Sequence, residues 1–258
     1  MAVHAETVVH YHFDDGQNGG PVVTATDVGP HGLDGTGVGI LSYSNEVAPH
    51  PWSGPLSLDA TADFDYINIA HHSVLETPDV TVEVLARPRY DAFTGGGSSP
   101  HFMVNKSWSA GPGAHLATYG LAYEPQLNRF EAFIGYGDGT GLRLLTDSLF
   151  DDGAWYHVAM TYETDLDRSL LALYVDSILA GCQIAPPRPL FFDNLPLTIG
   201  AANFIADDHV YRRNFIGQLD EVRVSNRALR AEDLTMRDRV FFDSFELNND
   251  FSGCTVVS

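Results

Sequence analysis

The segment Phe215–Leu229, FIGQLDEVRVSNRAL, decides how the chain is expected to fold. Gly217 breaks an apolar run, and the residues after it carry hydrophobic side chains on the core side of a predicted strand. Two adjacent acids, Asp220 and Glu221, stand in the middle of that strand. Strands favour β-branched and aromatic residues, so we expect a cation or a basic side chain to neutralise at least one of these acids.

The rest of the chain has the composition of an all-β protein. It contains 24 glycines and 14 prolines in 258 residues. Short alternating segments are separated by turn signals roughly every ten residues, with almost no helical pattern, as in two-sheet sandwiches. We therefore predict a single antiparallel β-sandwich over residues 1–238, with very little helix, followed by a C-terminal tail over residues 239–258. The clearest strands are predicted over Thr7–Phe13, Val80–Arg87, His101–Lys106, Tyr119–Tyr123, Arg129–Tyr136, Trp155–Tyr162 and Leu170–Val175.

The formal net charge is −20 at pH 7. Such a chain repels nucleic acid and anionic membranes, and a glycan ligand is expected to be neutral for the same reason. The sequence has no run of about 18 apolar residues that would insert into a membrane. An acidic chain whose only lysine is Lys106 fits a secreted or cell-surface protein. We expect that a signal peptide has been removed ahead of the first strand.

Two cysteines, Cys182 and Cys254, lack the spacing of metal ligands. In an exported protein they can form one disulfide that ties the C-terminal tail to the sandwich. In a reducing compartment they would remain two free thiols. The sequence leaves both alternatives open.

Seven short motifs follow one another in an order that resembles a known family. They are Tyr11–Asp14, Asp27–Gly35, Val80–Glu83, Trp155–Ala159, Leu173–Asp176, Leu197–Gly200 and Phe215–Leu229. Over about residues 6–236 the chain is similar to the laminin-G-like jelly rolls of the concanavalin A-like lectin/glucanase superfamily. The resemblance implies a two-sheet antiparallel jelly-roll sandwich. One departure is Ser177, which follows Asp176 where the family usually has glycine, so we expect the turn to differ there.

The same resemblance implies a structural Ca²⁺ between the N-terminal segment and the acidic strand. Calcium prefers several oxygen ligands from carboxylates and carbonyls, and loop carbonyls near residues 32–34 would contribute. In the alternative interpretation Asp220 pairs with Arg223 or Arg227, and the loop acids are solvated. The carboxylates implied as calcium ligands are Asp14, Asp15, Asp27 and Asp220.

A polar, aromatic-flanked sheet face is the predicted carbohydrate-binding surface. Alternation within Arg129–Tyr136 places Arg129 and Glu131 on one face of a strand, and aromatic rings nearby would stack on sugars. The alternative is an ordinary solvated face with aromatic residues in the core. The predicted ligand-binding residues are Trp108, Tyr119, Tyr123, Arg129, Glu131 and Tyr136.

Three classes of function remain. The favoured one is a non-catalytic, extracellular carbohydrate-binding or adhesion module. A polysaccharide lyase or glycoside hydrolase is the second, but the sequence lacks the Glu-x-Asp-x-x-Glu run of the glucanase members, and glycoside hydrolysis needs two carboxylates. The third is a protein-interaction domain that uses its edge loops. If the protein is an enzyme, its catalytic residues are predicted to be His101, Tyr119, Arg129 and Glu131.

His10 and His12 are two residues apart and share one face of the first predicted strand. A transition-metal site needs a third ligand that converges on them. The sequence marks no such ligand, so we interpret both as structural histidines.

Overall fold

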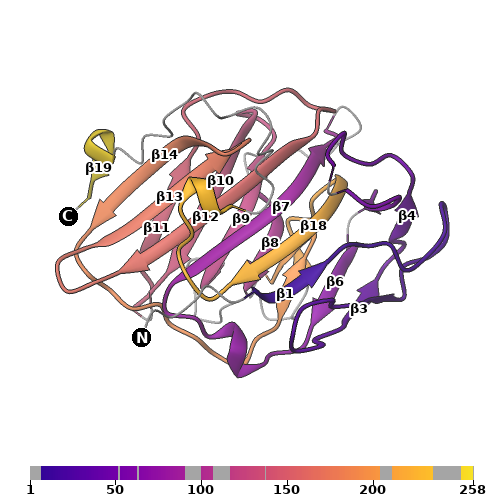
Figure 1. Cartoon of the computed structure of the whole chain (residues 1–258), viewed down its shortest axis with the longest axis horizontal. Coiled ribbons are helices and arrows are strands. Elements are labelled where there is room, and N and C mark those ends of the chain that lie inside the picture. The colour runs from indigo at the N-terminus through magenta and orange to yellow at the C-terminus, as the bar shows by residue number, and fades with distance from the viewer. Residues whose placement is uncertain are drawn as a thin grey trace.

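The computed structural model describes residues 7–51, 53–62, 64–90, 100–106, 117–136, 138–203, 211–234 and 251–257. Two large β-sheets pack face to face (Figure 1). Every strand pairing in them is antiparallel except that of the last strand. Helical structure in the described part is limited to three short 3-10 turns, at Ser73–Leu75, Ala231–Asp233 and Phe251–Gly253. The predicted all-β, antiparallel jelly-roll sandwich with very little helix is therefore confirmed.

The first sheet has nine strands, with the first strand of the chain placed beside one of the last (Figure 1). Seven of its strands come from the chain between Ser42 and Ser225. In spatial order its members are β19 (Thr255–Val256), β14 (Ile178–Ala185), β13 (Ser169–Val175), β12 (Tyr156–Thr164), β7 (Val80–Pro88), β18 (Gly217–Ser225), β5 (Ser57–Ala60) and β4 (Ser42–Ser44), with β1 (Thr7–Tyr11) paired to β18.

The second sheet has eight strands, and its face that points away from the core is called the outer face below. A two-stranded ribbon, β16 (Ala202–Asn203) and β17 (Tyr211–Arg212), lies beside β8. In spatial order the eight strands are β11 (Gly141–Leu145), β10 (Arg129–Gly135), β9 (Tyr119–Glu124), β8 (His101–Lys106), β15 (Leu197–Ile199), β6 (Tyr66–Ile69), β3 (Gly35–Val38) and β2 (Thr24–Ala25).

The core lies between the sheets and is built from alternate residues of each strand. On β7, Val80, Val82 and Val84 belong to the core cluster, as their alternation predicts. On β10, Phe130 and Ile134 do the same. Each fully buried side chain of this size stabilises the fold by roughly 1.5–3 kcal/mol. A slip of one residue in register would turn such a set away from the core, so the alternation also specifies the register.

The C-terminal tail is joined to the sandwich in two ways. Cys182 on β14 and Cys254 form a disulfide across a sequence separation of 72 residues. The two residues after Cys254 form β19, which pairs in parallel with β14 and sets Thr255 opposite Gln183. Of the two alternatives left open by the sequence, the structure has the disulfide.

The turn that departs from the family pattern keeps a left-handed backbone without glycine. Asp176 has φ 51° and Ser177 has φ 63°. Aspartate tolerates this region better than most residues, and here its Oδ1 also accepts the backbone N–H of His157 at 3.0 Å. The expectation of a different turn is therefore wrong, because both turn residues keep the left-handed backbone conformation that glycine favours.

Candidate functional site

The adjacent acids of β18 lie at a β-bulge. Asp220 is paired with Leu85 of β7, whereas Arg223 is paired with Glu83, so β18 holds one extra residue between these two pairs. Glu221 takes up the extra length with a positive φ of 51°. Bulges turn side chains out of the regular alternation. In this way both carboxylates are placed in buried positions, with Asp220 0% and Glu221 2% exposed.

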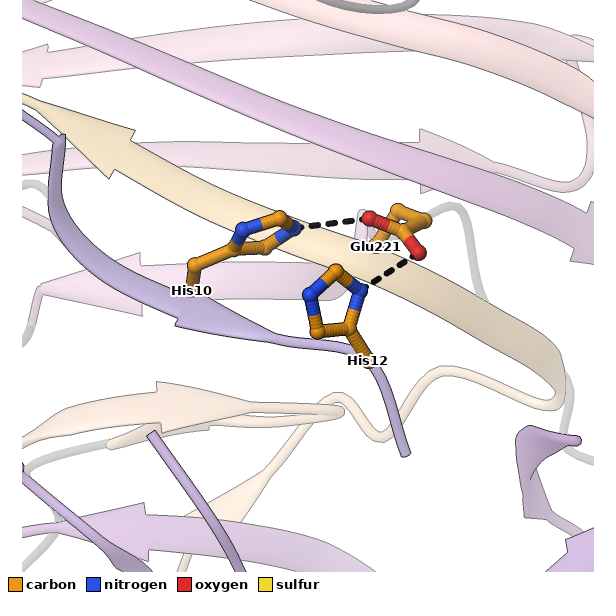
Figure 2. A group of neighbouring side chains, drawn as sticks. All are labelled: His10, His12 and Glu221. Carbon is orange, nitrogen blue, oxygen red and sulfur yellow. Dashed lines mark hydrogen bonds and ion pairs between the residues drawn. The ribbon is translucent and has the colours of Figure 1, made fainter. Parts of the chain in front are cut away.

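The partners of Glu221 are the two histidines at the end of β1 (Figure 2). The antiparallel pairing of β1 with β18 sets His10 opposite Arg223. His10 Nε2 lies 2.7 Å from Glu221 Oε2, and His12 Nδ1 lies 2.6 Å from Oε1. The imidazole ring centroids are 4.0 Å apart. The predicted neutralising group therefore exists, and for Glu221 it is a pair of histidines.

Burial and hydrogen bonding have opposite effects on these groups. Burial by itself raises the pKa of Glu221, but the hydrogen bonds from His10 and His12 outweigh it, and the pKa lies below its usual value. Burial lowers the pKa of His10, which favours the neutral imidazole. Asp220 has no such donors, and burial next to the charge of Glu221 raises its pKa to about 8.

The carboxylates predicted as calcium ligands have separate roles in the structure. Asp27, 6% exposed, accepts three backbone N–H groups at 2.8 Å, from His10, Gly29 and Leu33, and so orders the N-terminal loop. The remaining three acids also accept backbone N–H groups. Asp14 accepts from Leu56, Asp15 from Thr26 and Asp220 from Glu221.

These four carboxylates do not form one convergent group. Within the described ranges, the potential metal ligands that do converge are His10, His12 and Glu221. Their ligand atoms lie within 4.8 Å of one another. Asp220 Oδ2 is buried without a hydrogen-bond partner in that part of the chain. An orphaned buried oxygen fits a cation ligand, whereas both oxygens of Asp27 already accept backbone N–H groups from β1 and the loop. The calcium site stays a prediction, with Asp220 as the carboxylate that fits it best.

Glu131 and Arg143 form an ion pair on the outer face of the eight-stranded sheet. Glu131 is fully buried, and both its oxygens contact Arg143, with Nη2 to Oε2 at 3.2 Å. The Arg143 side chain is nevertheless 48% exposed, and its guanidinium carbon lies 5.7 Å from the ring centroid of Phe133. Burial raises the pKa of Glu131, although the hydrogen bond and charge of Arg143 oppose the rise.

The aromatic residues predicted to flank Glu131 lie on the opposite side of the sheet. Tyr119, Tyr123 and Tyr136 belong to the core cluster and are at most 4% exposed. The hydroxyl of Tyr119 donates to the carbonyl of Leu75 at 3.1 Å. These tyrosines cannot stack on a sugar from within the core, so their predicted place in a ligand-binding face is wrong.

The remaining predicted residues have different outcomes. His101 is 5% exposed, and its Nδ1 lies 2.6 Å from the carbonyl oxygen of Asn214, so it lies in the interior with Tyr119 and not on an enzyme surface. Trp108 lies outside the described residues. Arg129 and Glu131 are two residues apart on β10, so they share the outer face, as predicted.

Two residues of these sites, and the histidine partners of a third, were not predicted from the sequence. Arg143 follows the in-out alternation of β11 and was detectable as an arginine between two leucines. Glu124 is fully buried, and neither of its carboxylate oxygens has a hydrogen-bond partner among the described residues. Glu221 was noticed as an awkward acid, but its convergence with His10 depends on a contact across 211 residues. No local signal reports such a contact.

Several solved structures are similar to this chain in fold. The binding domain of Paraclostridial Mosquitocidal Protein 1 has a TM-score of 0.61 at 11% identity, covering 88% of this chain and 50% of that one. Domain 4 of an extracellular GH43 arabinanase from Geobacillus stearothermophilus, solved with arabinotriose, has a TM-score of 0.55 at 14% identity and covers 90% and 97%. The binding domain of botulinum neurotoxin DC, in complex with SialylT, has a TM-score of 0.53 at 8% identity and covers 88% and 49%. The chain thus spans about half the length of these toxin binding domains.

The sequence comparisons agree with the fold. No curated protein matches the chain. A family model described as the concanavalin A-like lectin/glucanases superfamily matches residues 61–235, which is more than half of the chain. The matched region includes β7, β12, β13 and β18, the central strands of the nine-stranded sheet. This protein therefore belongs to the concanavalin A-like lectin/glucanase superfamily.

Proposed function

We propose that this protein is an extracellular carbohydrate-binding module that binds a neutral glycan on the outer face of the eight-stranded sheet. Arg143 would be the central contact, paired with Glu131, and Arg129 would lie further along β10 on the same face. The observation that carries the proposal is that Arg143 is held in place by a fully buried carboxylate while nearly half of its side chain is exposed. The arabinotriose complex of a domain with the same fold supports a sugar as the ligand class.

A guanidinium held in this way is well suited to sugar hydroxyls. It carries five N–H donors in a fixed plane, and Glu131 contacts its Nε and Nη2 atoms. Nη1 makes no hydrogen bond within the described part of the chain. Because the side chain is already ordered by the ion pair, binding a ligand costs less conformational entropy. The ring of Phe133 lies beneath the guanidinium and keeps it off the sheet.

Replacing Arg143 with alanine is expected to weaken glycan binding by at least about tenfold, because a hydrogen bond to a charged group contributes about 1.5–3 kcal/mol. Affinity electrophoresis on a panel of neutral and acidic polysaccharides, followed by calorimetry on the strongest ligand, measures the effect. Arg143→Lys keeps the charge opposite Glu131 but loses the planar donors, and should bind almost as weakly. Arg230→Ala is the matched control, because Arg230 is 69% exposed with a loose 3.6 Å contact to Glu232.

Melting curves of each variant show whether the fold is kept. Binding that survives Arg143→Ala in a folded protein would exclude this surface. A protein that binds no polysaccharide on the panel would instead favour an interaction domain for another protein.

A polysaccharide-degrading enzyme is the second candidate, favoured by a second carboxylate on the same face. Glu124 is opposite Arg129 on β9, and Glu131 is opposite Ala122, so both acids point to the outer side. The raised pKa of Glu131 would suit a general acid. Assays for new reducing ends and for unsaturated uronate decide between the candidates. Product formation by the parent chain that is lost in Glu131→Gln would make the protein an enzyme. If the parent chain forms no product, the result supports a binding module.

We also propose that a structural calcium ion lies between β1 and β18. Asp220 would supply its unpartnered Oδ2, and Asp14, whose charge acts on Asp220, would supply a second carboxylate. Excess EDTA is then expected to lower the melting temperature and added Ca²⁺ to restore it, by about 2–4 °C for each kcal/mol of binding energy. Asp220→Asn should remove the response. An unchanged melting temperature, with no calcium in elemental analysis, would remove this part of the proposal and leave the glycan site untouched.

A further inference from the structure

The triad of His10, His12 and Glu221 has the composition of a transition-metal site. Two imidazole nitrogens and one carboxylate are the donors that zinc binds in sites with an open fourth position. All three ligand atoms lie within 4.8 Å of one another. Figure 2 shows both rings turned toward the same carboxylate, His10 from β1 and His12 from the residues that follow it.

The spacing of the donors allows a metal with only a small adjustment. Zinc–nitrogen and zinc–oxygen bonds of about 2.0–2.2 Å in a tetrahedron separate neighbouring ligand atoms by about 3.3 Å. The present separations from Glu221 are 2.7 Å and 2.6 Å, so each histidine would move outward by roughly half an ångström. His12 can do so, because its side chain is 36% exposed.

The surroundings of the triad place one opposing charge beside it and leave an entry path from solvent. Arg223 lies against the His10 ring, with Nη2 3.4 Å from Nδ1 and 3.5 Å from Nε2, and its charge opposes a bound cation. The Glu221 carboxylate, which lies between the two rings, supplies the opposite charge. The exposed side of His12 leaves one position open to solvent, whereas Glu221 is buried.

We propose that His10, His12 and Glu221 bind one divalent transition-metal ion, with Zn²⁺ as its representative, and keep its fourth position open on the His12 side. The ion would join β1 to β18 across 211 residues of sequence. The site lies on the nine-stranded sheet, away from the proposed glycan surface on the other sheet. It also differs from the proposed calcium site in donor chemistry, because imidazole nitrogen suits zinc and calcium takes oxygen ligands.

The test is calorimetric titration of the whole chain with Zn²⁺, Co²⁺ and Ca²⁺, after dialysis against chelator. One Zn²⁺ per chain is expected, together with a rise in melting temperature of about 5 °C or more at saturation. Bound Co²⁺ should give visible d–d absorption that reports nitrogen coordination. His12→Ala should weaken Zn²⁺ binding by about 100-fold or more, since even changes behind metal ligands cost 10–100-fold. Glu221→Gln and His10→Gln should do the same.

His31→Ala is the matched control, because His31 is an exposed loop histidine, and it should bind Zn²⁺ like the parent chain. Asp14→Asn should weaken Ca²⁺ binding alone, which keeps failure of the calcium proposal distinct from failure of this one. His12 is partly exposed, so its replacement is not expected to unfold the protein. Zinc binding that is absent, or that persists unchanged in His12→Ala, would overturn the proposal and leave the triad as a hydrogen-bonded structural cluster.

Discussion

The variant Asp27→Ala is expected to be less stable than the parent chain by about 3–5 kcal/mol in free energy of unfolding. Its carboxylate accepts three backbone N–H groups at 2.8 Å in an almost fully buried position. Each hydrogen bond to a charged acceptor contributes about 1.5–3 kcal/mol, and its loss leaves a partly buried donor unpaired. Urea denaturation, with the slope compared between variants, measures the change.

Asp34→Ala is the matched control for this prediction. Asp34 is an exposed acid of the same loop and accepts one N–H, that of Asp27, at 2.9 Å. We expect its loss to be about 1 kcal/mol. Equal losses in the two variants would contradict the organising role of Asp27. If Asp27→Ala lowers the free energy of unfolding in the presence of Ca²⁺ but not in the presence of chelator, Asp27 acts as the calcium ligand that the family resemblance implies.

Removing the disulfide by the double change Cys182→Ala and Cys254→Ala is expected to lower the free energy of unfolding by up to about 4 kcal/mol. In the chain-entropy description, a cross-link over a loop of this size restricts the unfolded chain by that amount. The separation of the two cysteines is 72 residues. Apart from the disulfide, the described part of the tail is held by the two-residue strand β19, by the packing of Phe251 and Val257, and by the backbone N–H of Val257, which donates to Ile184.

Denaturation with and without reductant checks this second prediction. The parent chain should lose stability in reductant, whereas the double variant should be indifferent to it. Limited proteolysis followed by mass spectrometry should release the tail from the variant and leave it attached to the oxidised parent. A parent chain that carries two alkylatable thiols when purified under oxidising conditions would contradict the disulfide itself.

Much of the fold was accessible from local pattern. The alternation of Val80, Val82 and Val84 identified both a strand and its core side, and the structure agrees. Local pattern also placed Arg129 and Glu131 on one face of β10.

The candidate sites depended on information that local pattern does not hold. Tyr119 and Tyr123 were grouped with Glu131 because they lie on a neighbouring strand. The register of β9 against β10 sets them opposite Ile134 and Phe130, which are core residues. Neighbouring residues on paired strands share a face, so one pairing decides whether a tyrosine meets a ligand or the interior.

By itself the sequence determined the strand content, the core side of strands such as β7 and β10 and the resemblance that leads to the superfamily, because the two-residue period of a strand is a local property. Only the tertiary structure decided the partners of the central acids. The bulge at Glu221 and the pairing of β1 with β18 bring His10 and His12 to that carboxylate. A contact over such a separation depends on how the whole chain packs, and no stretch of residues near Glu221 encodes it alone.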